Sequence, residues 1–133
     1  MRDQPTGEGL LETARAVLRD DLIPTLPSDK RHAALMIANA LSIAARQLKH
    51  GDAGERAELA ALERLLSEPF PARTDDAPAL RNALVAANRS LSQWIRAGRS
   101  DDGNLRDSVR AHLDAVIRRK VAESNPKYLG AKA

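Results

Sequence analysis

The chain has 133 residues, of which 43% are hydrophobic and only 2% aromatic, and its formal net charge is +3. This length suits one domain that can form a core without a metal or a disulfide. The sequence contains no cysteine, which excludes a disulfide framework, a thiolate zinc site and a cysteine nucleophile. The N-terminus has no apolar signal region and no run of about 20 apolar residues follows, so we expect a cytoplasmic protein without a membrane span.

Two helices are predicted in the first fifty residues. The first begins near Thr6, carries leucine, alanine and valine at helical spacing, and ends at the prolines Pro24 and Pro27. Ser28 can cap the second helix, which we expect over about 29–50, with Gly51 as its stop signal.

The second helix has the most informative pattern in the chain. In the segment Ala33–Ala45 every residue except Asn39 and Ser42 is apolar. At 3.6 residues per turn these side chains point almost all the way round the helix axis, which is typical of a helix surrounded by other helices. The sequence therefore predicts a fold built around one buried central helix.

Three further helices are predicted in the rest of the chain. A shorter one covers about Gly54–Ser67 and is followed by the proline-rich segment Glu68–Pro78, in which Phe70 is expected to reach the core. A fourth helix starts near residue 76 and ends before Gly98, with Trp94 on its core-facing stripe. A fifth ends at Asn125, which precedes a proline.

These elements predict an all-α fold, a single-domain bundle over residues 1–133 with four long helices and a shorter one. The ends, 1–5 and 127–133, are expected to be disordered.

Charge is distributed unevenly. Residues 52–76 contain seven acidic and three basic side chains, whereas residues 106–133 contain seven basic and three acidic ones. These two regions either pair with each other or present separate surfaces to a partner.

The sequence contains no recognisable catalytic or metal-binding constellation. None of the three histidines, His32, His50 and His112, follows a glutamate by three residues, as a helical di-metal site would require. Nucleophile-elbow, phosphate-loop and dinucleotide-binding motifs are also missing from the sequence. We therefore expect a protein that is not an enzyme and has no catalytic residue, metal or cofactor.

Two polar residues of the central helix are candidate contact residues. Asn39 either hydrogen-bonds a neighbouring helix, through Asn82 or Asn88, or approaches a groove or a partner subunit together with Arg46, two turns away on the same side. Arg46 is expected at the edge of the buried zone with its guanidinium available for a carboxylate or a phosphate. Arg31, at the start of the helix, is a further candidate.

A basic cluster near the end of the fifth helix provides the remaining candidates, Arg118, Arg119 and Lys120. Such a cluster is usually solvated and complements the helix dipole. The chain has almost no aromatic residues for base stacking, so we do not expect nucleic-acid binding. Docking on an acidic partner, or steering of an anionic ligand such as a coenzyme A phosphate, fits the cluster better.

The segments LLETARAVLRDDLIPTLP (Leu10–Pro27) and RHAALMIANALSIAARQL (Arg31–Leu48) resemble a family of small all-helical bacterial proteins of unknown function. The shared pattern is a first helix that ends with Arg-x-x-Leu-hydrophobic-Pro-x-Leu, here at residues 19–26. A basic turn follows, and then an alanine-rich helix with Ala-Asn-Ala at 38–40 and Ala-Arg-x-Leu at 45–48. The resemblance is clearest over the first fifty residues.

Members of that family are typically encoded beside an aminoglycoside-phosphotransferase-like kinase and an acyl-CoA dehydrogenase. One resembles the small accessory subunit of a hydroxyacyl-CoA kinase of levulinate catabolism. The resemblance therefore implies a non-catalytic accessory subunit that binds and supports such a kinase, and it assigns no catalytic residue to this chain.

Two alternatives stay open from the sequence. One is a self-associating helical scaffold, a homodimer whose contact buries exposed leucines or Trp94. The other is a ligand-binding module with a pocket near Asn39 for an anionic, acyl-CoA-like ligand.

Overall fold

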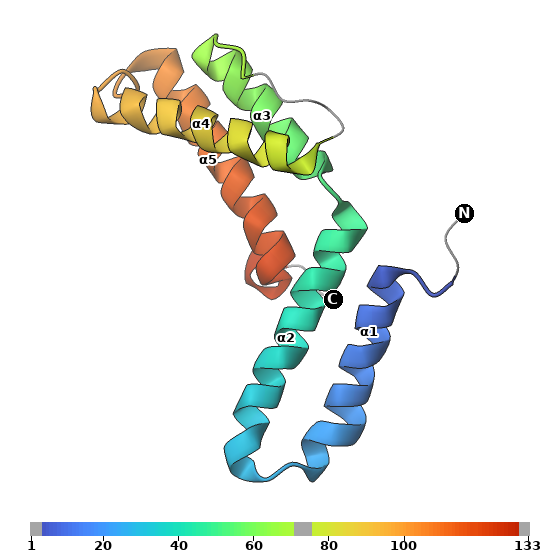
Figure 1. Cartoon of the computed structure of the whole chain (residues 1–133). Helices are drawn as coiled ribbons and strands as arrows, with labels where there is room; N and C mark the ends of the chain where they lie inside the picture. The colour runs from blue at the N-terminus through green and yellow to red at the C-terminus, as the bar shows by residue number, and fades with distance from the viewer. Residues whose placement is uncertain (1–3, 71–75, 131–133) are drawn as a thin grey trace. The chain divides into compact units, whose positions relative to one another are not determined.

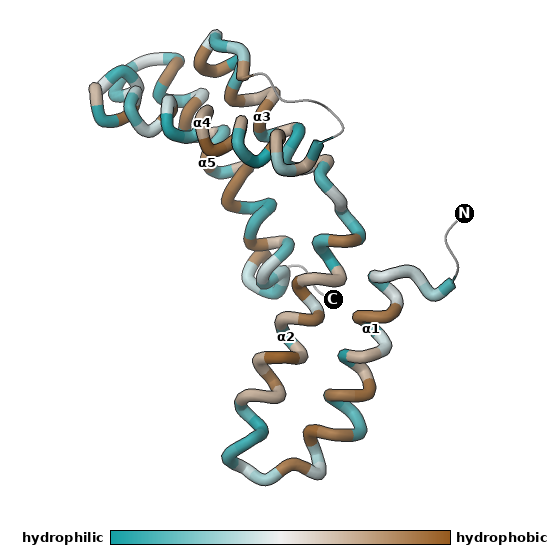
Figure 2. The backbone as a smooth tube through the Cα atoms, in the orientation of Figure 1, coloured by the Kyte–Doolittle hydropathy of each residue, from teal (hydrophilic) through white to brown (hydrophobic). Residues whose placement is uncertain are grey.

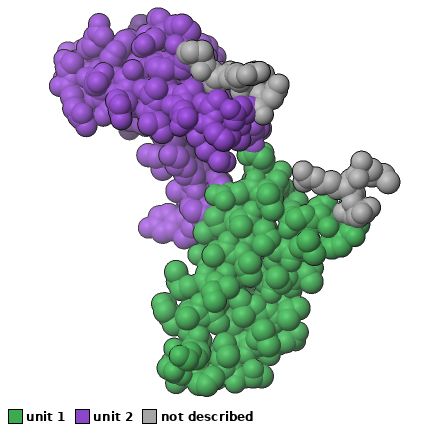
Figure 3. All heavy atoms as spheres, viewed as in Figure 1, with its two compact units in different colours: residues 1–51 green, residues 52–133 purple. Residues whose placement is uncertain are grey.

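A computed structural model of the chain describes residues 4–70 and 76–130, and within these residues it contains five α-helices and no strand (Figure 1). The all-α prediction is confirmed. The helices are α1 (Gly7–Val17), α2 (Ser28–His50), α3 (Ala53–Leu66), α4 (Ala77–Arg96) and α5 (Gly103–Ser124). The chain divides into two compact units, residues 1–51 and 52–133 (Figure 3).

In unit 1, α1 and α2 form an antiparallel hairpin (Figure 1). Thr6 caps α1 as predicted, because its hydroxyl accepts a hydrogen bond from the backbone N–H of Gly9 at 3.3 Å. The first helix is shorter than predicted and passes into a π-helical turn, η1 (Leu18–Leu22), and a 3-10 turn, η2 (Ile23–Thr25). Pro24 lies in this turn and has no N–H to continue the α-helical hydrogen bonds.

The bounds of α2 match the predicted helix over 29–50, but the predicted burial is wrong. Only three residues of α2 are buried, Ala34, Ala38 and Ala45, whereas Leu35, Met36 and Ile37 are more than half exposed. The reason is that α1 and the turn after it are the elements of unit 1 that pack on α2. One neighbouring helix covers one side of a helix, so the other apolar sides stay open.

Unit 2 contains the main hydrophobic core. Helix α3 packs against α4 and α5, and the buried residues are contributed by all three helices and by Phe70, which reaches the core as predicted. Leu62 and Leu80 are the largest fully buried side chains. Trp94 is partly buried and packs against this core, as its place on the predicted stripe indicated. Helix α3 is shorter than α2, α4 and α5, as predicted, and α1 continues through η1, so that the first helical segment covers residues 7–22.

The expected disorder of the tail is also corrected in part, because Pro126–Leu129 forms a 3-10 turn, η3, in which Tyr128 is exposed. Predicted disorder at 1–3 and 131–133 concerns residues outside the described part of the chain. No helix among the described residues is long and apolar enough to cross a membrane.

Candidate functional site

The hairpin of unit 1 has one closed seam and two open faces. The alanines Ala34, Ala38 and Ala45 are buried at the seam between α1 and α2. They repeat at intervals of four and seven residues and so share one side of α2. Figure 2 shows that further hydrophobic residues recur along both helices, in addition to these alanines. The open faces lie on the two sides of the seam.

One open face is apolar. We define it by Ala33, Met36, Ile37, Ala40, Ile43 and Ala44 of α2 and by Leu10, Ala14 and Val17 of α1. Around the helix axis, the residues of α2 are rotated backwards from Ala34 by about 60–180°, and those of α1 are rotated backwards from the half-buried Leu11 by about 60–120°. Because the two helices are antiparallel, this rotation brings both sets to the same side of the hairpin. Leu10, Met36 and Ile37 are 54–56% exposed, and the face contains no charged side chain.

The other open face is polar and follows the opposite side of α2. We define it by Arg31, Leu35, Asn39, Ser42 and Arg46. The prediction that Asn39 is a buried amide is wrong, because Asn39 is exposed. The prediction that Arg46 lies at the edge of the buried zone is confirmed. Its Nη1 donates to the hydroxyl of Ser42 at 2.7 Å, and Nε of Arg31 donates to the carbonyl of Leu26 at 3.0 Å.

Unit 2 contains a polar cluster, defined here as Glu58, Asn88, His112 and Arg119. Glu58 is 6% exposed. Its Oε1 accepts a hydrogen bond from Nδ2 of Asn88 at 3.1 Å, and its Oε2 pairs with Nη2 of Arg119. Arg119 also donates through Nη1 to the carbonyl of Gly54. The cluster therefore connects α3, α4 and α5.

The polar cluster holds its three helices together by hydrogen bonds and an ion pair. Both oxygens of Glu58 are engaged, and the guanidinium of Arg119 supplies the positive charge that a buried carboxylate needs. Burial lowers the pKa of His112, whose Nε2 is buried without a hydrogen-bond partner. The negative charge of Glu58 raises the pKa of His112, and the positive charge of Arg119 lowers it. Because its pKa is lowered, His112 favours the neutral form.

The basic cluster predicted at residues 118–120 is divided by the structure. Arg119 pairs with Glu58, and its side chain is 33% exposed; its role as a partner contact stays a prediction. Arg118 is exposed and pairs with Asp114 through Nε at 2.7 Å, one turn away on the same helix. Lys120 is exposed. The pairing of Arg119 with Glu58 joins the acidic middle of the chain to its basic end, one of the two alternatives that the sequence left open.

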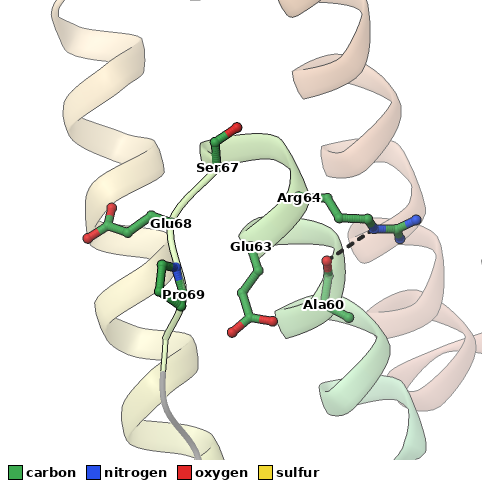
Figure 4. A pocket seen from close by; sticks show the side chains of 6 residues that line it. All are labelled: Ala60, Glu63, Arg64, Ser67, Glu68 and Pro69. Atoms are coloured by element: carbon green, nitrogen blue, oxygen red, sulfur yellow. Dashed lines mark hydrogen bonds between the residues drawn. The ribbon is translucent and has the colours of Figure 1, made fainter.

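A hollow of about 460 Å³ lies at the C-terminal end of α3, lined by Ala60, Glu63, Arg64, Ser67, Glu68 and Pro69 (Figure 4). Figure 4 shows the side chains of Glu68 and Arg64 pointing in opposite directions, so that their charges do not converge. Glu63 accepts a hydrogen bond from the backbone N–H of Phe70 at 2.9 Å, which fixes the start of the next segment. Asn39 is not among the residues that line this hollow.

Sequence reasoning missed Glu58, and it considered His112 only as a possible metal ligand. A signal for Glu58 exists, because it precedes Leu62 by four residues and Leu66 by eight and so shares their buried side of α3. His112 follows the buried Val109 by three residues on α5. A polar residue on an apolar stripe needs a partner, and this pattern marks both positions; Glu58 is paired with Asn88 and Arg119, whereas Nε2 of His112 has no hydrogen-bond partner. Among the described residues no group of three or more histidine, aspartate or glutamate side chains could hold a metal ion.

A family model described as a domain of unknown function (DUF6285) matches residues 24–128. No curated protein and no solved structure matches the chain.

Proposed function

We propose that the chain, which belongs to the family described as a domain of unknown function (DUF6285), is a non-catalytic accessory subunit that binds a kinase. The partner is a phosphotransferase-type kinase of the aminoglycoside-phosphotransferase-like class that acts on hydroxyacyl-CoA substrates. The identity of this partner rests on the resemblance of residues 10–27 and 31–48 to a family encoded beside such kinases.

The observation that carries the proposal is the polar face of the hairpin. Its five residues recur along α2 at helical spacing over about 22 Å. Leu35 is 52% exposed and has polar neighbours on both sides along the helix. Interfaces between proteins that also exist apart commonly combine such an apolar centre with a polar rim in which arginine is enriched.

Charge supports an acidic partner at this face. Arg31 and Arg46 lie fifteen residues apart on the same side of α2, near its two ends. Planar guanidinium groups bind carboxylates in a bidentate manner, so acidic side chains of a kinase could engage both ends of the face. Lys120 of α5 is an additional exposed cation for such a partner.

The experiment is co-expression of the chain with a candidate kinase from the same genome, followed by copurification and measurement of turnover on a hydroxyacyl-CoA. We expect the chain to copurify and to raise the soluble yield or turnover of the kinase. The double variant Arg31→Glu/Leu35→Glu should weaken binding by at least about 30-fold. Arg89→Glu, an exposed arginine of α4, is the matched control and should bind normally.

Two outcomes count against the proposal, and each contradicts a different part of it. If the kinase has the same yield, solubility and turnover without the chain, the accessory role is wrong. If the chain supports the kinase and the double variant binds as well as the wild type, the role stands but the polar face is not its surface.

A further inference from the structure

We infer that the apolar face of the hairpin is covered by the same face of a second copy of this chain, so that two hairpins form a four-helix bundle. This inference goes beyond the accessory role, because it concerns the opposite side of α2. The small core of unit 1, the spacing of the residues on the face and the charges around it all favour such a contact.

The core of unit 1 is too small for a free-standing unit. The described residues that are buried there are three alanines, Ala34, Ala38 and Ala45, the smallest apolar side chains that a core can use. Unit 2, in contrast, buries six leucines and a phenylalanine in a core of its own. Helical units of about fifty residues usually need a further source of stability, of which oligomerisation is one. The apolar face is the surface that oligomerisation would bury.

The spacing on the face is that of a helix–helix contact. Ala33 and Ala40 are seven residues apart, and so are Met36 and Ile43, which gives a heptad pattern with small residues at one core position and large residues at the other. A second heptad on α2, which contains Ala38 and Ala45, already faces α1. A helix with two such seams contacts two helices, and unit 1 supplies one of them.

A second copy of α2 fits this pattern when it runs antiparallel with Ala40 on the two-fold axis. Residues whose numbers sum to 80 then lie opposite each other, so Met36 faces Ala44 of the second copy and Ile37 faces Ile43. Met36 thus meets a small side chain and Ile37 meets another large one, and the two alanines at position 40 allow the helices to approach closely. An isologous contact of this kind uses the same patch twice and closes on itself.

Charge is compatible with this arrangement. No charged side chain lies on the face, so no ion is buried without a partner when two copies meet. The antiparallel register places the start of one α2, with Asp29 in its first turn, beside the end of the other, with His50 in its last turn. The ends of the two helix dipoles that adjoin in this register have opposite signs.

The oligomeric state of the full chain tests the inference. Light scattering after size exclusion should give twice the monomer mass of 14.4 kDa. Ala40→Glu places a charge at the centre of the contact and should weaken the dimer by at least about 30-fold, giving monomer. Leu35→Glu lies about 140° away around α2 and is the matched control that should stay dimeric. Circular dichroism checks that both variants are helical.

A cysteine experiment decides the question if Ala40→Glu fails to fold. The natural sequence has no cysteine, so Ala40→Cys introduces a single thiol. Because the two-fold axis brings the two copies of position 40 together, mild oxidation should give a covalent dimer, whereas Leu35→Cys should give little.

Three results would overturn the inference. They are a wild-type chain that is monomeric at high micromolar concentration, a dimer that Ala40→Glu leaves intact, and cross-linking at position 35 that equals cross-linking at 40. Loss of kinase copurification in Ala40→Glu, with a monomeric wild type, would assign the apolar face to the kinase instead. Failure of the dimer leaves the polar-face test unaffected, because the two experiments alter opposite sides of α2.

Discussion

Replacing Arg119 with methionine tests whether the polar cluster holds unit 2 together. The substitution keeps most of the apolar stem and removes the guanidinium. Glu58, at 6% exposure, then keeps the hydrogen bond from Asn88 but loses its counter-charge, and the carbonyl of Gly54 loses a donor. Breaking a buried ion pair from one side costs about 3–5 kcal/mol. Because the side chain of Arg119 is 33% exposed, we expect a smaller loss, about 2–3 kcal/mol of unfolding free energy.

Urea denaturation followed by tryptophan fluorescence measures this loss. Trp94 is the only tryptophan in the chain and packs against the core of unit 2, so its signal reports on this unit. The matched control is Arg118→Met. Arg118 is the neighbouring residue, but its ion pair with Asp114 is exposed on both sides, and its loss should cost less than about 0.5 kcal/mol.

A double-mutant cycle separates the ion pair from the packing of its side chains. Glu58→Leu alone should leave Arg119 with the carbonyl of Gly54, and Glu58→Leu/Arg119→Met should recover part of the stability because no charge remains buried. We expect a coupling energy of at least about 1.5 kcal/mol between the two positions. If Arg119→Met costs no more than Arg118→Met, or if the coupling is near zero, the cluster does not stabilise the unit as argued.

Further predictions concern single residues of unit 2. The folded pKa of His112 is below its ordinary value of 6.5. At pH values between these two pKa values, His112 therefore takes up a proton when the protein unfolds. Stability should therefore be full above about pH 6.5 and fall as the pH drops toward the folded pKa, and His112→Gln should flatten this slope in urea titrations at several pH values. Leu62→Ala removes a side chain with 0% exposure and should cost about 3 kcal/mol in the fluorescence assay; a loss below about 1 kcal/mol would contradict its place in the core. Ser67→Gly relieves a left-handed backbone (φ 52°) at the end of α3 and should raise the thermal midpoint by a few degrees, whereas Ser67→Val should lower it.

The ends of the helices were determined by the sequence itself. Thr6, Pro24 and Gly51 act through their own backbone and side-chain chemistry within one turn, so no distant residue is needed to place them. The second helix was predicted over 29–50 and forms over Ser28–His50 for this reason. The all-α class follows equally from local signals.

Burial was decided by the tertiary structure. The apolar segment of α2 shows which sides of the helix can be buried, but not how many neighbouring helices are available to cover them. In unit 1 a single helix packs on α2, so Asn39, Met36 and Ile37 are exposed, although the sequence pattern predicted a surrounded helix.

The polar cluster was decided in the same way. The sequence identified an acidic region and a basic region as possible partners, and it placed Arg119 in the basic one. The partner within the acidic region depends on the register of α5 against α3, which is set by packing between residues 61 positions apart. A charge pattern along the chain has no information about that register, because hydrogen bonds and ion pairs depend on distances in space that only the packed helices fix.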